Sequence, residues 1–115
     1  MIFDYKSSVK NGINCFLLYG ELIDKGQSMG MLDEVKAAAE KGENKILLNL
    51  SDLKYINSSG LNVLINILPI SRKADADVAI CNDNKKINEL LVITKLNSVF
   101  NVCKTEEEAI AVLNK

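Results

Sequence analysis

The sequence predicts a single α/β domain (residues 1–115) with a mixed, mostly parallel sheet. Its 115 residues suit one domain and are enough to bury one core. Short apolar runs typical of strands alternate with segments in which apolar residues recur every three or four positions. A hydrophobic share of 48%, six Gly and one Pro indicate a globular chain without a linker. The predicted order is β-β-α-β-α-β-α-β-α.

The first two runs predict a β-hairpin. Residues 3–9 and 13–19 are apolar-rich and flank Lys10-Asn11-Gly12, whose Asn-Gly supplies the positive φ values of a tight turn. Residues 20–26 are expected to form a loop. The next segment predicts an amphipathic helix that ends near Gly42. Its apolar positions are Met29, Leu32, Val35 and Ala39.

A nearly continuous apolar run, Lys45–Leu50, predicts a central strand covered on both faces. Residues 51–57 are expected to connect it to a helix that begins near Ser58. Apolar positions of this helix are Leu61, Leu64, Ile65 and Leu68. Because Pro69 has no N–H and its ring clashes with the preceding turn, the helix should kink or stop near Leu68.

The last third predicts two strands and two helices. Residues 77–81 and 98–102 are expected to be strands, and residues 82–84 a turn with an N-cap. Ile87, Leu90, Leu91 and Thr94 mark the third helix, and Ala109, Ile110 and Leu113 the fourth. Thr105 and Glu108 match a capping box. This alternation implies parallel pairing, with the first hairpin as an antiparallel edge.

The charge pattern argues against several partners. Fourteen basic and fifteen acidic residues give a net charge of −1 and are interspersed, so nucleic-acid binding is not expected. The first residues lack a secretory signal, and the longest near-apolar run, residues 61–70, is broken and too short to span a bilayer. We therefore expect a cytoplasmic protein without direct membrane insertion.

No motif of autonomous catalysis is present. The sequence contains no His, which excludes a Ser-His-Asp arrangement, and it has neither a phosphate-binding loop nor a dinucleotide fingerprint. Cys15, Cys81 and Cys103 are far apart and show no Cys-x-x-Cys spacing, so buried thiols are expected in place of a disulfide or zinc site. No catalytic residue, metal or cofactor is predicted.

The polar segment Asn57-Ser58-Ser59-Gly60 follows the predicted central strand, at the edge where sites gather in such folds. Asn57 or Ser58 can cap the next helix. A helix start also suits a phosphate, so Ser58 can be a switch. Gly60 permits close approach of another backbone, from a partner or from within the chain.

The helix after this segment is apolar on most sides. It carries a second apolar row, which a binding partner or a second packed helix could cover. The residues of this row are Val63, Ile67 and Ile70, and the narrow polar stripe consists of Asn62 and Asn66. The sequence leaves both alternatives open.

Three segments together resemble one known family. Residues 48–64, which contain Ile-Asn-Ser-Ser-Gly-Leu, resemble the signature of bacterial anti-sigma factor antagonists of the STAS family, usually written Asp-Ser-Ser-Gly-Leu. Gly20-Glu21-Leu22 is similar to the family's Gly-Glu-Leu after the second strand, and residues 87–96 are similar to its third helix. The resemblance covers essentially the whole chain.

The resemblance implies a STAS-like domain without catalytic activity that acts in transcription regulation. In that family a serine-kinase-type anti-sigma factor with its own bound ATP phosphorylates the serine equivalent to Ser58. The unphosphorylated antagonist binds the anti-sigma factor and so releases the sigma factor. A phosphatase and a homodimer are compatible with this role. The expected partner-binding residues are Asn57, Ser59, Gly60, Leu61, Asn62 and Asp24.

Two positions depart from the family pattern. Asn57 stands where Asp is usual, and Ile23 stands where Asp commonly follows Gly-Glu-Leu, with Asp24 one place later. Asn57 keeps the size and the capping ability of Asp but removes its charge. The alternative is a STAS adaptor subunit of a transport or signalling complex without a phosphorylation cycle.

Overall fold

The computed structural model describes residues 3–10, 12–42, 45–81, 84–98 and 100–114. In this part of the chain one sheet has the spatial order β1-β2-β3-β4-β5. β1 is antiparallel to β2, and all other neighbours pair in parallel, which confirms the predicted mixed sheet and element order. The strands are β1 (Asp4–Lys10), β2 (Ile13–Leu22), β3 (Lys45–Ile56), β4 (Asp77–Cys81) and β5 (Asn101–Cys103).

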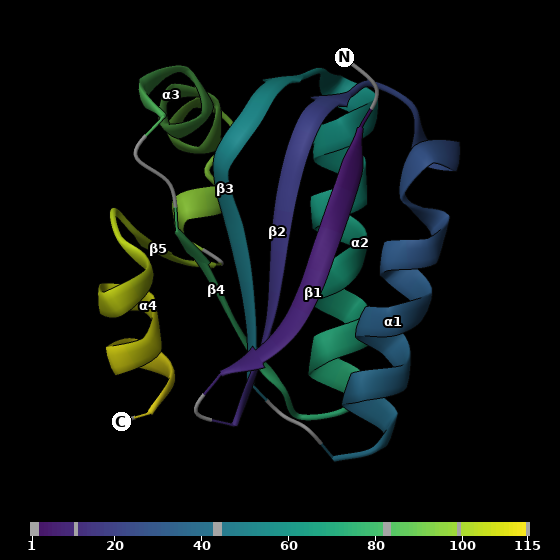
Figure 1. The fold of residues 1–115 in the computed structure, drawn as a ribbon. Coiled ribbons are helices and arrows are strands. Elements are labelled where there is room, and N and C mark those ends of the chain that lie inside the picture. Colours follow the sequence, from purple (N-terminus) through teal and green to yellow (C-terminus); the bar gives the residue numbers. More distant parts are fainter. Residues whose placement is uncertain (1–2, 11, 43–44, 82–83, 99, 115) are drawn as a thin grey trace.

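Helices cover both faces of the sheet. Figure 1 shows α1 and α2 side by side on one face and α4 on the other. The helices are α1 (Met29–Glu40), α2 (Ser58–Lys73), α3 (Lys85–Ile93) and α4 (Glu106–Leu113), with 3₁₀ turns at Lys25–Ser28 and Leu96–Ser98. None of the helices in the described ranges is long and apolar enough to cross a bilayer.

Strand periodicity divides the core into two clusters. Val78 and Ile80 face the larger cluster, under α1, α2 and α3, whereas Ala79 and Cys81 face the smaller one, under α4. Successive side chains of a strand point to opposite faces, so a strand covered on both sides is apolar at every position. In β3, Ile46, Leu48 and Leu50 belong to the larger cluster and Leu47 to the smaller one, which confirms the prediction that Lys45–Leu50 belongs to a central strand covered on both faces.

Strands β2 and β3 extend beyond their predicted ends. The expected loop begins only after Leu22, and the expected connection over residues 51–57 is strand as far as Ile56, so both predictions were wrong. The extensions pair with each other, Leu22 opposite Ile56, through a ladder with register shifts. Backbone pairing sustains the strand where polar side chains interrupt the apolar pattern.

Helix α1 buries a face slightly different from the predicted one. Met29 is 55% exposed, and the fully or nearly buried positions are Met31, Val35, Ala38 and Ala39. The 3₁₀ turn at Lys25–Ser28 leads directly into α1. The C-terminal end near Gly42 is confirmed, since the helix ends at Glu40 and Gly42 has a φ of +83°.

Helix α2 continues through Pro69 to Lys73, so the predicted stop near Leu68 was wrong. A proline at this position cannot bond to the carbonyl of Ile65, four residues back. Ile65 is 40% exposed and Pro69 is also exposed, so this bond is missing on the face that meets water. Solvent can satisfy the carbonyl there, and the lost bond does not end the helix.

The second apolar row of α2 lies within the molecule. Val63 and Ile67 are fully buried in the same cluster as Met31 and Val35 of α1, and Ile70 is half-buried. Of the two alternatives, a second packed helix therefore accounts for this row. Partner contact is not needed to explain it.

The C-terminal region agrees with most predictions. Asn84 caps α3, because its Oδ1 accepts hydrogen bonds from the N–H groups of Lys86 at 3.0 Å and Ile87 at 3.3 Å. Residues 82–83 of the predicted turn lie outside the described residues, as does Asn11 of the hairpin. The last strand is Asn101–Cys103 and not 98–102, since Leu96–Ser98 forms a 3₁₀ turn.

The predicted capping box of α4 is only half formed. Thr105 Oγ1 accepts from the N–H of Glu108 at 3.2 Å, as expected for an N-cap. The Glu108 carboxylate accepts from the N–H of Lys104 at 3.4 Å instead of from Thr105. The predicted apolar face is present, with Ala109 and Leu113 buried and Ile110 half-buried.

Candidate functional site

The candidate site lies at the junction of β3 and α2, at the carboxyl edge of the sheet. Asn57 is the N-cap of α2, with extended backbone angles of φ −108° and ψ −171°. Its Oδ1 accepts a hydrogen bond from the N–H of Gly60 at 2.9 Å, which satisfies one of the N–H groups that a helix start leaves without an intrahelical partner. Of the two predicted caps, Asn57 is therefore the N-cap, and Ser58 is the first residue of the helix.

Asn57 also joins α2 to the end of β2. Its N–H donates to the carbonyl oxygen of Leu22 at 3.3 Å, and its side-chain Nδ2 donates to that of Ile23 at 3.1 Å. One residue thus binds the helix start and the segment that leaves the neighbouring strand. This arrangement fixes the turn that carries Ser58.

Gly60 is required by contacts inside the chain. A Cβ atom at this position would lie 2.3 Å from the carbonyl oxygen of Leu22 and 2.6 Å from Cγ1 of Ile56. The backbone that approaches Gly60 is therefore that of β2 in the same molecule. Tight packing explains this glycine without a partner.

The predicted phosphoacceptor Ser58 and the predicted partner-binding residues of α2 divide into exposed and buried groups. Ser58, Ser59 and Asn62 are exposed on the first turns of α2. Gly60 is buried, and Leu61 is only 9% exposed and belongs to the main core cluster. The expectation that Leu61 faces a partner needs correction, because its side chain points inward with the apolar face of α2.

Asp24 is exposed and caps the 3₁₀ turn that follows β2. Its Oδ1 accepts from the N–H of Gly26 at 3.1 Å, while Oε1 of Gln27 accepts from the N–H groups of Ile23 and Asp24, both at 3.0 Å. Because Asn57 bonds to the adjacent carbonyl of Ile23, this turn lies beside the start of α2. The structure thus brings Asp24 and Ser58 to the same edge.

Two exposed apolar side chains near this edge were not predicted. Ile23 is 44% exposed and is the first residue after β2. Tyr55 is 52% exposed and lies two residues before Asn57, near the end of β3. Ile23 follows Leu22, and Tyr55 pairs with Glu21 across the ladder. Both exposures could have been inferred from the sequence. Ile23 is an apolar residue where the family commonly has Asp, and Tyr55 lies in the segment 51–57 that was expected to be a connection.

The local electrostatics suit an anion at Ser58. A helix start carries partial positive charge from its aligned peptide dipoles and its unpaired N–H groups. The first turn of α2 contains no acidic side chain, in contrast to that of α4, which has three. A phosphate on Ser58 would therefore meet a favourable backbone field without repulsion from a neighbour in that turn.

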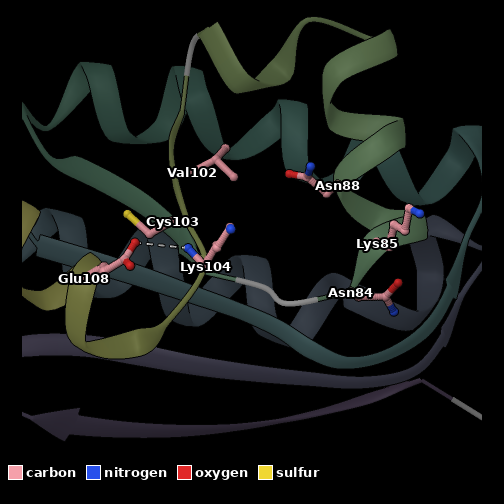
Figure 2. A pocket seen from close by; sticks show the side chains of 7 residues that line it. All are labelled: Asn84, Lys85, Asn88, Val102, Cys103, Lys104 and Glu108. Atoms are coloured by element: carbon pink, nitrogen blue, oxygen red, sulfur yellow. Dashed lines mark hydrogen bonds between the residues drawn. The ribbon is translucent and has the colours of Figure 1, made fainter.

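A pocket of about 720 Å³ lies elsewhere on the carboxyl edge, between β5 and the starts of α3 and α4 (Figure 2). It shares no residue with the segment around Ser58. The lining residues are Asn84, Lys85, Asn88, Val102, Cys103, Lys104 and Glu108. The Glu108 carboxylate bonds to the backbone N–H of Lys104, so it is engaged in the start of α4.

The environment of the three cysteines disfavours the reactive thiolate form. Burial raises the pKa of Cys81 to about 12 and also raises the pKa values of Cys15 and Cys103, which keeps the less reactive thiol form. Cys15 and Cys81 are buried as predicted, whereas Cys103 is only half-buried, because it ends the short edge strand β5. Within the described residues no group of three or more Cys, Asp and Glu side chains is placed to hold a metal ion.

Comparisons with known proteins agree on one family. The STAS domain model matches residues 5–109. BtrV of Bordetella bronchiseptica, whose name assigns it provisionally to the anti-sigma factor antagonists, is 31% identical over 78 residues, which span 68% of this chain and 67% of BtrV.

Solved structures agree on the fold. An anti-sigma factor antagonist from Mycobacterium paratuberculosis is 16% identical, with a TM-score of 0.84 over 98% of this chain and 95% of that chain. The phosphorylated form of SpoIIAA, a Bacillus cell fate determinant, is 19% identical, with a TM-score of 0.73 over 94% of this chain and 97% of that chain. At these identities the likenesses establish the architecture.

Proposed function

Since the chain belongs to the STAS-domain family, we propose that it is an anti-sigma factor antagonist switched by phosphorylation of Ser58. Its partner in this proposal is a serine-kinase-type anti-sigma factor. The observation that carries the proposal is the position of Ser58, an exposed first residue of α2 whose helix is already capped by Asn57. The hydroxyl is thereby left available to a kinase.

The partner supplies the chemistry in this proposal. The chain contains no His to act as a base, and its thiols have raised pKa values, so we assign it the role of a binding protein and substrate. ATP belongs to the kinase. The cycle takes place in the cytoplasm, and a phosphatase that removes the group would restore the binding form.

Phosphorylation would act through charge and size. A phosphate adds about −1.5 to −2 charges and considerable bulk to a contact previously made by a neutral hydroxyl. If this costs about 3 kcal/mol of binding free energy, the affinity falls by about two powers of ten. Such a change dissociates a moderately tight complex.

Intact-mass measurement after incubation with the kinase-type anti-sigma factor and ATP tests the proposal. We expect one added phosphoryl group on the wild type and on Ser59→Ala, and none on Ser58→Ala. Ser59 is the matched control, because it is the adjacent exposed serine on the same turn. An unmodified wild type, or modification at another residue, would contradict the switch and leave the adaptor subunit as the better explanation.

A further inference from the structure

The side chain of Asn57 connects two segments that are far apart in the sequence. Its Oδ1 accepts from Gly60 N–H at 2.9 Å, and its Nδ2 donates to the carbonyl oxygen of Ile23, 34 residues earlier, at 3.1 Å. We propose that Asn57 is a positioning residue that holds the Ile23–Gln27 turn against the start of α2, so that a partner recognises both as one surface. This inference rests on the proposed function.

The Ile23–Gln27 turn is preformed. Asp24 and Gln27 cap it reciprocally, with hydrogen bonds of 3.0 and 3.1 Å to backbone N–H groups of the same turn. The bond from Asn57 to Ile23 therefore fastens a structured unit to α2. It sets where the exposed side chains of Ile23 and Asp24 lie relative to Ser58.

An aspartate at position 57 could make only one of the two bonds. A carboxylate accepts hydrogen bonds but cannot donate one, so Asn57→Asp would keep the cap on Gly60 and lose the bond to Ile23. It would also set a negative charge against the Ile23 carbonyl oxygen. The departure of this chain from the family's usual Asp thus provides a connection that the usual residue does not.

Two substitutions separate the cap from the connection. Asn57→Ser retains a capping oxygen without adding charge, and Asn57→Asp retains one and adds a charge. Both remove the Nδ2 group that donates to Ile23: the carboxylate has no donor, and the serine hydroxyl is one bond closer to the backbone than Nδ2. Asn88→Ser, at an exposed position of α3, is the matched control. Hydrogen exchange of the unbound protein measures the connection directly, and titration with the kinase-type anti-sigma factor measures recognition.

We expect both Asn57 variants to exchange the amides of residues 23–28 about 2- to 10-fold faster, with the amides of β4 unchanged, because one hydrogen bond of ordinary strength is lost. Affinity for the kinase-type anti-sigma factor should fall by a similar factor, and Asn88→Ser should match the wild type in both measurements. Unchanged exchange at residues 23–28 would overturn the inference, as would faster exchange with unchanged affinity. A wild type that does not bind the partner at all would instead contradict the proposed function, and exchange alone would then decide the positioning role.

Discussion

Substitution of Gly60 by alanine should destabilise the protein, although alanine is the better helix former. The added Cβ would have to move from 2.3 to about 3.4 Å from the Leu22 carbonyl oxygen, which is a backbone atom of the sheet. Overpacking of this kind costs about 1–3 kcal/mol, and displacement of Leu22 also weakens its hydrogen bond with Asn57, worth about 1 kcal/mol. The gain in helix propensity offsets about 1 kcal/mol. The expected net loss is about 1–3 kcal/mol.

Gly30→Ala provides the matched control within the same fold. Gly30 is also helical, in α1, but a Cβ there would lie 3.4 Å from the Tyr5 hydroxyl oxygen, close to an ordinary contact. The same substitution should therefore be neutral or stabilise by up to about 1 kcal/mol.

Thermal and urea denaturation followed by circular dichroism would measure both variants. For a domain of this size we expect Gly60→Ala to lower Tm by roughly 4 °C for each kcal/mol, with no decrease for Gly30→Ala. If Gly60→Ala is as stable as the wild type, the close approach of β2 to α2 is not the reason for this glycine. The proposed geometry of the Ser58 turn would then be wrong.

Two further predictions concern titratable groups. With a thiol reagent at pH 8, Cys103 should react before Cys81, because Cys103 is half-buried whereas burial raises the pKa of Cys81 to about 12; peptide mass mapping that finds Cys81 modified first would contradict this order. The hydrogen bond from Tyr5 to Glu34, together with burial, raises the pKa of Tyr5 from 10.0 to about 12. This contribution to stability is complete below about pH 10 and is lost as the pH rises towards 12, so the difference in urea midpoint between wild type and Tyr5→Phe should shrink over that range; a constant difference would contradict it.

The sequence predicted the order of elements correctly but misplaced several boundaries. The continuous apolar run of β3 ends at Leu50, and the buried side chains beyond it, Leu53 and Ile56, are three residues apart, which is not the spacing of a regular strand. The strand nevertheless continues to Ile56, because its backbone pairs with β2 beyond the last pair with β4. Because this ladder contains register shifts, the buried positions do not alternate as they do in a regular strand. The stop predicted at Pro69 was wrong for a similar reason. The cost of the hydrogen bond that a proline removes depends on whether the carbonyl four residues back, here that of Ile65, faces water, and the local sequence does not show this.

The candidate site was predictable in its residues and less so in their roles. The sequence identified Asn57, Ser58 and Gly60 together, and residue preference predicted a cap at Asn57 or Ser58 without choosing between them. The bond from Asn57 to Ile23, and the contact of Gly60 with Leu22, depend on how β2 ends beside α2. These are tertiary contacts between segments more than thirty residues apart, which a linear pattern does not contain.

The affinity of the kinase-type anti-sigma factor for the unmodified and the mass-verified Ser58-phosphorylated protein tests the central claim most directly. Titration calorimetry of the two forms should show a loss of about two powers of ten on phosphorylation, and Ser58→Ala should bind like the unmodified protein even with ATP present. Equal affinity of the two forms would contradict the switch at Ser58.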